Sequence, residues 1–413
     1  MAAVNYTTGF ISVVTGCLGV HGAYASAAVV PHLTAICACG AIVSAYVTMA
    51  AYKDDKSTEL ILSELKTLDK KIGELSHKMD ALFGDLKSFI TTSHFYMNEV
   101  ATIKTLMKYM QDTMNNPCKY TKELFRGAVT DNKPLWIAEQ MIIKLDQEET
   151  NPLKMAMNCD PLRPTETFEK WRKIIDGVLA QCLILETYQN GMFCDKNMIG
   201  PSRLKKQTEE LQLKMNRWAE EYRQDHSYWD DGVLSLIHNV QDNNEGSENI
   251  RNILTKELGK IMTNHKFYVI VYDFCDGSSE EYQFTSYSYF KRNFKSSFNR
   301  NGCNAFVLRS LRTQDCKRHE ENLQRKLQAA LPMEYDYRFK LIDYAEKLCK
   351  RFGDECGLVL IIRRNTTIFF GPVNWYLNEY SKRPGALIEG FFEKTFLGKN
   401  YDRKSFWIFA GVS

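Results

Sequence analysis

The sequence lacks the short motifs by which most enzymes and metal-binding proteins are recognised. Its 12 cysteines form no pair of CxxC motifs, and no Cys and His spacing would hold zinc. No glycine-rich phosphate loop follows the first predicted strand, where Asp273 and Asp276 read as strand-end and turn residues. No histidine forms a convincing nucleophile pair with a cysteine. We therefore predict no catalytic residues, no metal and no cofactor.

Net charge is also small. A formal charge of +3 over 413 residues gives no basic surface of the kind that binds nucleic acid, so we expect no nucleic-acid partner. The length leaves room for two or three domains. The even cysteine count permits disulfides, for example between Cys349 and Cys356, but free buried thiols are equally ordinary, so the compartment stays open.

Charge is absent from the first 52 residues, which contain no Lys, Arg, Asp or Glu. Pro31 divides them into two apolar stretches, roughly 9–30 and 33–52, each near the length that crosses a bilayer as a helix. Small residues at helix-packing spacing would let the two helices approach closely as a hairpin. We predict that residues 1–52 are the membrane-insertion segment, with these residues on the packing or insertion faces: Gly9, Ser12, Gly16, Gly19, Ala23, Ser26, Pro31, Ala38, Ala41 and Ala45.

Four interpretations of this segment compete. A cleaved signal peptide fits the small residues at 23–28, but there is no basic region before them and the apolar character continues beyond. The others are a permanent transmembrane hairpin, a hairpin hidden in the soluble fold and released at a membrane, and a core hairpin that never meets lipid. We favour the released hairpin. Charging His21 or His32 in this apolar run would be costly and could bias release toward low pH.

A long heptad pattern follows the hairpin. Apolar residues alternate by four and three from Ile61 to Met114, which predicts one unbroken helix of roughly 80 to 90 Å with a coiled-coil seam. Pro117 ends it. A long core helix without a membrane role is the competing interpretation. The first part of the seam comprises Ile61, Leu65, Leu68, Ile72, Leu75, Met79, Leu82, Leu86 and Phe89.

Further helices are predicted after this rod, and they can bury a common seam in an up-and-down bundle covering residues 53–240. A polar link and a helix follow at 241–264. The predicted helices begin near Lys119, Pro134, Thr165, Pro201 and Gly232, and residues 151–164, with three prolines, read as a loop.

In the last third of the chain, residues 265–413, the apolar residues follow a different spacing. Short apolar runs at 267–274, 304–311, 357–364 and 406–412 read as strands, and amphipathic helices are predicted near 287–298, 319–331, 335–352 and 374–396. This alternation indicates an α/β domain with at least partly parallel pairing. The predicted fold class is therefore α plus α/β: an elongated long-helix bundle with an N-terminal apolar hairpin, followed by a smaller C-terminal α/β domain.

Basic and aromatic residues cluster in the predicted helix at 287–298. Lys291, Arg292 and Lys295 could contact an anionic membrane surface, with the aromatic rings at the interface. The spacing of Phe290, Phe294 and Phe298 suits packing against a sheet equally well, and we favour packing.

The N-terminal half resembles two protein families. An uncharged small-residue hairpin at Gly9–Ala51 beside a long heptad helix resembles the α-helical pore-forming toxins of the cytolysin A and Cry6 type. The glycine-rich run followed by the helix at Ile61–Phe89 is also similar to the rapunzel-like proteins of animals. The toxin resemblance implies a water-soluble form that hides the hairpin, then exposes it and assembles on a bilayer. The apolar segment here is N-terminal and an α/β domain follows, which departs from the toxin pattern.

We therefore expect a membrane-active, pore-forming or membrane-perturbing protein that is soluble before insertion and becomes membrane-associated. Its expected partners are a lipid membrane, further copies of itself in a homo-oligomer, and a protein or receptor bound by the C-terminal domain. The alternative is a non-enzymatic coiled-coil scaffold whose C-terminal α/β domain is a recognition module.

Overall fold

A computed structural model describes most of the chain from residue 99 onward and one helix near its start. The described residues are 33–49, 66, 70, 95, 99–193, 199–273, 282–285, 294–310, 316–330, 333–335, 341–352, 356–363, 368–373, 385–396 and 399–412. The chain divides into two compact units, residues 1–221 and 222–413, which we call the helical unit and the sheet unit.

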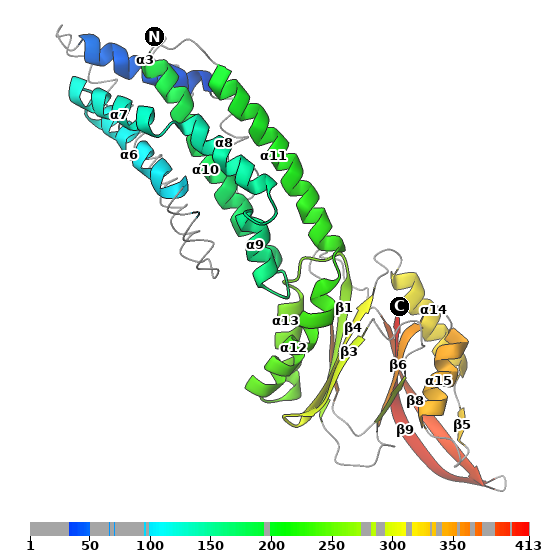
Figure 1. Ribbon diagram of the computed structural model, residues 1–413. Coiled ribbons are helices and arrows are strands. Elements are labelled where there is room, and N and C mark those ends of the chain that lie inside the picture. Colours follow the sequence, from blue (N-terminus) through cyan, green and yellow to red (C-terminus); the bar gives the residue numbers. More distant parts are fainter. Residues whose placement is uncertain are drawn as a thin grey trace. The chain divides into compact units, whose positions relative to one another are not determined.

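The helical unit is built around one long helix, α10. The described helices are α3 (Leu33–Met49), α6 (Ala101–Asn115), α7 (Lys119–Asp131), α8 (Pro134–Asp146), α9 (Pro152–Cys159), α10 (Thr165–Met192) and α11 (Ile199–Gln224) (Figure 1). From Phe168 to Met192 most α10 side chains are buried. α10 packs against α3, α6, α8 and α9, and Gln212 of α11 donates to Asp176 of α10 at 3.3 Å. α10 is therefore the core of this unit.

Most of these helices begin and end where the sequence indicates. α6 buries Ile103, Met107, Met110 and Met114, the last residues of the heptad pattern, and it ends at Asn115 just before Pro117. The earlier seam residues from Ile61 to Phe89 lie outside the described part of the chain.

One helix in this unit was not predicted. α9 lies in the segment that reads as a loop, and it begins with Pro152 in its first turn. The Asn151 side chain accepts hydrogen bonds from the backbone nitrogens of Leu153 at 3.0 Å and Lys154 at 3.1 Å, which caps the helix. The three prolines of this segment led to the prediction of a loop, although Asn151 followed by Pro152 is a sequence that starts a helix.

The sheet unit contains two sheets. Its first sheet has the order β3-β4-β1-β7, formed by β1 (Lys266–Asp273), β3 (Phe294–Arg300), β4 (Cys303–Ser310) and β7 (Ile368–Val373). The second has the order β2-β6-β9-β8-β5, formed by β2 (Tyr282–Thr285), β5 (Met333–Tyr335), β6 (Cys356–Arg363), β8 (Gly385–Phe396) and β9 (Lys399–Val412).

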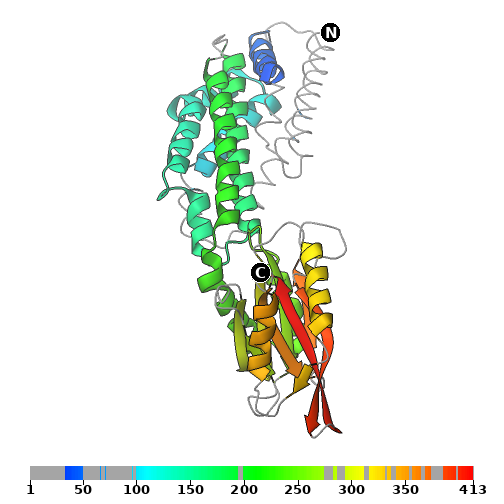
Figure 2. The same ribbon diagram turned by 90° about the vertical axis from the view of Figure 1, so that its right-hand side faces the viewer.

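Helices cover the outer faces of the two sheets: Figure 1 shows the layers from the side, and Figure 2 shows the second sheet behind the helices that cover it. α12 (Ser227–Asn243) and α13 (Ser247–Leu258) pack on the first sheet, while α14 (Cys316–Ala330) and α15 (Leu341–Phe352) pack on the second. Between the sheets, Tyr268 of β1 stacks on Phe409 of β9 with ring centroids 4.8 Å apart. The result is four layers in the order helix, sheet, sheet, helix.

The predicted fold class, a helical bundle followed by a smaller α/β part, is confirmed. The expected parallel pairing is found, among the described strands, only between β5 and β8, and the other pairs are antiparallel. Residues 232–240 were grouped with the bundle by sequence, whereas α12 packs on β3 within the sheet unit.

Two predicted helices were wrong in part. Residues 294–300 form strand β3, and residues 385–396 form strand β8, where helices were expected. Residues four apart share a face in both a helix and a strand, so the Phe294 and Phe298 spacing could not separate them. The turn between β3 and β4 favours the strand, because Asn301 and Gly302 adopt positive φ angles of 49° and 75°, which suit a β-hairpin.

Candidate functional site

The first candidate site is the contact between the uncharged helix α3 and α10. α3 has 17 residues and no charged side chain. It buries Ile36, Cys39 and Val43, each 0% exposed, whereas Ala41 is exposed and Ala38 and Ala45 are half-buried. A surface helix of a soluble protein ordinarily carries charged residues on its outer face. The outer face of α3 carries none.

Two glycines let α3 and α10 approach each other closely. A Cβ atom added to Gly191 of α10 would lie 1.8 Å from the carbonyl oxygen of Cys37, and one added to Gly40 would lie 2.2 Å from the carbonyl oxygen of Tyr188. Neither distance is compatible with a real side chain. α3 crosses the C-terminal end of α10 in Figure 1, and this crossing requires glycine on both helices.

A few polar contacts accompany this packing. Tyr188 of α10 and Thr113 of α6 share a buried hydrogen bond of 2.8 Å between their hydroxyl oxygens. Lys122 of α7 donates from Nζ to Ser44 Oγ of α3 at 2.7 Å. Burial raises the pKa of the Cys39 thiol to about 12, so this thiol is protonated and unreactive while α3 stays in place. Cys39 therefore reports on whether α3 is docked.

α10 also buries polar groups that a bundle core does not need. Asp176, Gln181, Glu186 and Asn190 are all at most 9% exposed. Within the described part of the chain, the Gln181 side-chain oxygen and nitrogen are buried without a hydrogen-bond partner. An unsatisfied buried polar group costs about 1 to 3 kcal/mol. The unpaired Gln181 amide therefore lowers the stability of the core around α10.

The predicted insertion residues that the structure describes lie on one side of α3. Ala38, Ala41 and Ala45 lie on the outer, partly exposed side of α3 rather than on its packing face. The residues that sequence analysis missed are Gly40 and Gly191, and the available signal was a glycine inside each helical pattern. Outside the described residues lie Gly9, Ser12, Gly16, Gly19, Ala23, Ser26, Pro31 and, among the histidines, His21 and His32.

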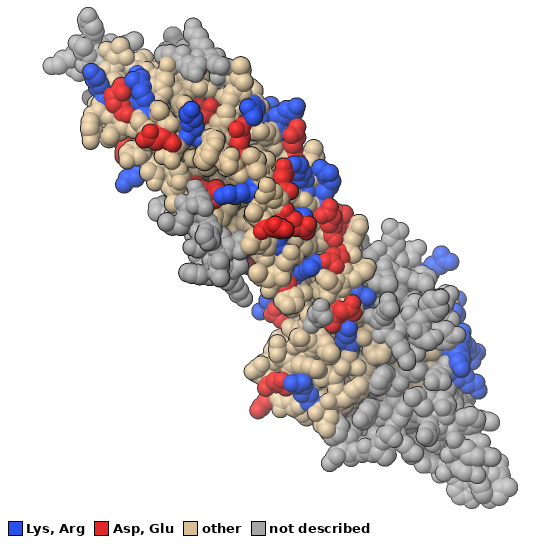
Figure 3. Space-filling model, viewed as in Figure 1, with Lys and Arg blue, Asp and Glu red and all other residues tan. Residues whose placement is uncertain are grey.

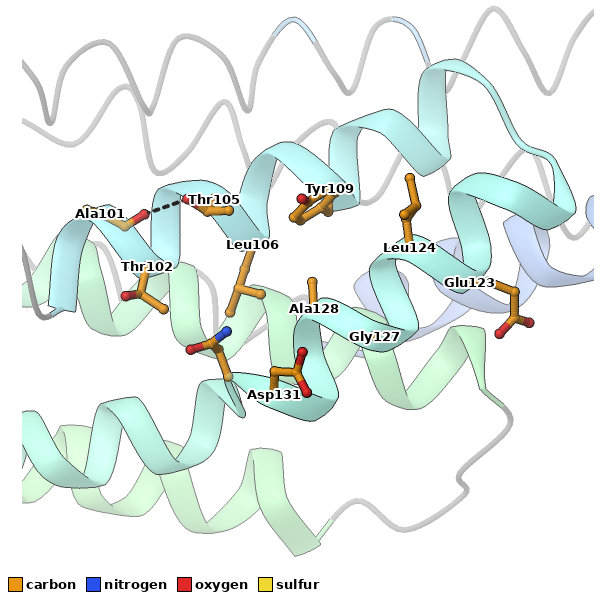
Figure 4. A pocket seen from close by; sticks show the side chains of 11 residues that line it. Ala101, Thr102, Thr105, Leu106, Tyr109, Glu123, Leu124, Gly127, Ala128 and Asp131 are labelled. Atoms are coloured by element: carbon orange, nitrogen blue, oxygen red, sulfur yellow. Dashed lines mark hydrogen bonds between the residues drawn. The ribbon is translucent and has the colours of Figure 1, made fainter.

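A separate cavity of about 580 Å³ lies between α6 and α7. Figure 4 shows Tyr109 of α6 and Leu124 of α7 along it, with Asp131 at one end, and Gly127 adds no side chain to its wall. The Thr105 hydroxyl beside it donates to the Ala101 carbonyl of its own helix at 2.9 Å. The described lining contains no Lys, Arg or His, so the cavity offers no cationic group for an anion.

Basic side chains are placed differently from the prediction. Lys295 lies on β3, where its Nζ is 3.4 Å from Asp230 and over the Trp229 ring, and Lys291 and Arg292 lie outside the described residues. Figure 3 shows Lys and Arg mixed with Asp and Glu over the visible face of the helical unit, and further basic side chains by α14 and α15. The exposed basic residues of these two helices are Arg318, Arg325, Lys347, Lys350 and Arg351.

The comparisons with known proteins give a family and no named function. Residues 63–400 match the family described as a protein of unknown function (DUF684), and the chain belongs to this family. No curated protein and no solved structure matches the chain, so the resemblance to pore-forming toxins and rapunzel-like proteins stays a prediction. Among the described residues, no helix combines the length and the apolar character needed to span a membrane.

Proposed function

We propose that this DUF684 protein is membrane-active: it holds α3 against α10 in water and delivers the uncharged N-terminal segment that contains α3 to a lipid bilayer, perturbing it. The observation that carries the proposal is the outer face of α3, which carries no charged residue although Ala41 and Thr48 are exposed, and the Thr48 hydroxyl donates to the Ser44 carbonyl of the same helix at 2.9 Å. An uncharged helix face that meets water in one state is suited to meet lipid in another.

Transfer of α3 requires that docking in the bundle and contact with lipid have similar free energies. The close glycine contact favours docking, because it brings the backbones of α3 and α10 into van der Waals contact. The buried Gln181 amide, which has no partner among the described residues, opposes a stable core. These opposing contributions support a metastable bundle.

The length of α3 bears on what it does in a bilayer. Seventeen helical residues extend for roughly 25 Å, slightly less than the hydrocarbon thickness of about 30 Å. α3 alone would thin the bilayer or lie near its surface. Leakage then requires several copies acting together, so we extend the proposal to a homo-oligomer on the membrane.

The test is dye release from anionic vesicles by the full chain and by two matched variants. Ala41→Glu places a carboxylate at an exposed position of α3, and Leu213→Glu does the same on α11, where Leu213 is 64% exposed. Neither change should alter folding in water. A charge at the centre of a membrane helix costs about 2.5 to 3.5 kcal/mol. We therefore expect leakage to fall at least tenfold for Ala41→Glu and to persist for Leu213→Glu.

Two results would contradict the proposal. The full chain could fail to release dye between pH 5 and 7.5 on any vesicle composition, or Ala41→Glu could leak as fast as the parent. Deletion of residues 1–52 provides a further arm, and that chain should bind vesicles weakly and release no dye.

A second candidate function is a non-enzymatic scaffold. Trp136 and Ile143 of α8 are 58% and 50% exposed, and large apolar side chains on a helix surface are common at protein interfaces. Their spacing of seven places them on one side of α8. Retention of a protein partner by the Ala41→Glu variant, without any leakage by the parent chain, would favour this function.

A further inference from the structure

Arg309 is a buried cation on the helix-covered face of the first sheet. It is 6% exposed, and within the described chain its Nε and Nη1 atoms are buried without a hydrogen-bond acceptor. It lies opposite Phe267 in the β1–β4 register, so its side chain shares a face with Phe267 beneath α12. Leaving two N–H groups of a buried cation without acceptors is costly, so their retention needs an explanation.

An aromatic ring covers one face of the guanidinium but leaves its edges open to hydrogen bonds. The Arg309 Cζ atom lies 4.6 Å from the centroid of the Trp229 ring. Stacking uses the flat face of the guanidinium, and the N–H groups point outward in its plane. The unpaired Nε and Nη1 groups are therefore held in position for an acceptor.

Two imidazole rings lie beside this cation. The rings of His226 and His265 are 4.6 Å apart, and His226 is exposed. Burial, followed by the charges of Arg309 and His226, lowers the pKa of His265 to about 4. Burial and then Arg309 also lower the pKa of His226, against the opposing effect of Asp230. Both imidazoles are thus in a positive electrostatic potential.

The Tyr228 hydroxyl lies within hydrogen-bonding distance of one ring nitrogen of His265, Nδ1. Tyr228 receives a hydrogen bond from Arg309. Its hydroxyl proton can then go to His265 Nδ1, 2.6 Å away, and Thr263 Oγ1 lies 3.1 Å from the same nitrogen. When the Tyr228 hydroxyl donates to this nitrogen rather than to Thr263 Oγ1, 3.1 Å from it, the ring proton of neutral His265 lies on Nε2.

We infer that Arg309, His265 and His226 form a binding site for a phosphate-type oxyanion. The anion accepts hydrogen bonds from Arg309 and from His265 Nε2 and enters past the exposed His226 ring. Asp230, the carboxylate that opposes this potential, is engaged 3.4 Å from Lys295. A doubly charged phosphate suits such a site better than a carboxylate, because Lys295 and a protonated His226 can balance its second charge.

This inference does not depend on the proposed function. The ligand chemistry is a phosphate group, whether it is free phosphate or the headgroup of a phosphatidic acid. An anion bound here would raise the pKa of both imidazoles, so affinity for the doubly charged form of phosphate should increase as the pH falls from 7.5 to 6.

The experiment measures the thermal stability and phosphate affinity of the full chain in sodium phosphate, with sodium chloride or sodium acetate at equal ionic strength as reference. We expect phosphate to stabilise the parent chain specifically. Arg309→Met should lose the phosphate effect, with an affinity at least tenfold weaker. His226→Gln, at an exposed position, should weaken affinity severalfold without impairing folding. The matched control is Arg300→Met, because Arg300 is paired with Asp242 on the surface of the same unit and its loss should leave the phosphate effect intact.

Vesicles of phosphatidic acid distinguish the two sources of phosphate. Competition between these vesicles and free phosphate, weakened severalfold in His226→Gln and lost in Arg309→Met, would assign the lipid headgroup as ligand, and its absence would assign free phosphate. The inference is overturned if neither source stabilises the chain more than chloride. It is also overturned if acetate matches phosphate, or if Arg309→Met or a folded His226→Gln retains the full phosphate effect.

Discussion

Gly191 of α10 lets α3 approach closely, and the atoms that it faces belong to the backbone of Cys37 on α3. Because backbone atoms cannot rotate away, a methyl group at this position must push the helices apart. Gly127 on α7 gives a matched control, since a Cβ atom added there would meet nothing within 4 Å. Comparing alanine substitutions at these two glycines therefore distinguishes the effect of close helix packing from the effect of helix propensity.

We predict that Gly191→Ala destabilises the helical unit by about 1 to 3 kcal/mol through overpacking. Gly127→Ala should instead stabilise it by up to about 1 kcal/mol, because alanine favours a helix. Denaturant unfolding measures both. Alkylation of Cys39, mapped by mass spectrometry, should accelerate in Gly191→Ala because its thiol becomes exposed, while buried Cys349 of the sheet unit stays protected. Equal Cys39 protection in both variants would contradict this role for Gly191.

A second residue-scale prediction concerns the buried hydrogen bond between Tyr188 and Thr113. Tyr188→Phe removes one hydroxyl and should cost about 0.5 to 1.5 kcal/mol of stability. Tyr120→Phe, at a side chain that is 71% exposed, should change nothing measurable. A double-mutant cycle with Thr113→Val tests the pair, and a coupling energy of zero would show that the hydrogen bond contributes nothing.

A third residue-scale prediction follows from the pKa of His265, which is about 4 in the folded chain and ordinarily near 6.5. Between these values the unfolded chain binds a proton that the folded chain does not. Stability of the sheet unit should therefore be constant above about pH 6.5 and fall as the pH decreases toward 4. Unfolding measured from pH 7.5 to 4.5 should show a weaker pH dependence for His265→Gln. His238→Gln on α12 should behave like the parent chain, and an unchanged slope in His265→Gln would contradict this account.

At the scale of elements, the sequence predicted those helices and strands whose apolar spacing or flanking residues fit only one type of structure. Pro134 in the first turn marked the start of α8, and the apolar runs marked β1, β4 and β6. β3 was misread because Phe294 and Phe298 share a face in either structure. The candidate site was predicted only in part, since absence of charge identified α3 as unusual. The glycine contact could not be found, because it joins Gly40 and Gly191, which are distant in sequence.

α9 offers an element-scale prediction. Asn151 is fully buried, caps α9 through its side-chain oxygen and donates from Nδ2 to the Leu145 carbonyl at 2.7 Å. Asn151→Ala should destabilise the helical unit by about 1 to 2 kcal/mol, because the cap is lost and buried backbone groups are left unpaired. Asn151→Asp keeps the cap acceptor and should recover part of that loss. Thermal unfolding compares the variants, and equal stability of Asn151→Ala and the parent would contradict the assigned cap.

At the scale of the whole molecule, the two compact units have separate hydrophobic cores. Changes in one unit should therefore alter its own unfolding transition. Calorimetry should show that Gly191→Ala shifts the transition of the helical unit, and that lowering the pH from 7.5 to 5 shifts the transition of the sheet unit. A single transition that responds equally to both changes would show that the units unfold together.

The central claim is that α3 leaves α10 and enters lipid, and photolabelling tests it most directly. The full chain is bound to vesicles that contain a phospholipid with a photoreactive group on its acyl chain, and labelled peptides are identified by mass spectrometry. We predict lipid adducts within residues 33–49, reduced strongly in Ala41→Glu and retained in Leu213→Glu. Vesicle-bound protein whose adducts lie elsewhere, with residues 33–49 unlabelled, would contradict the account.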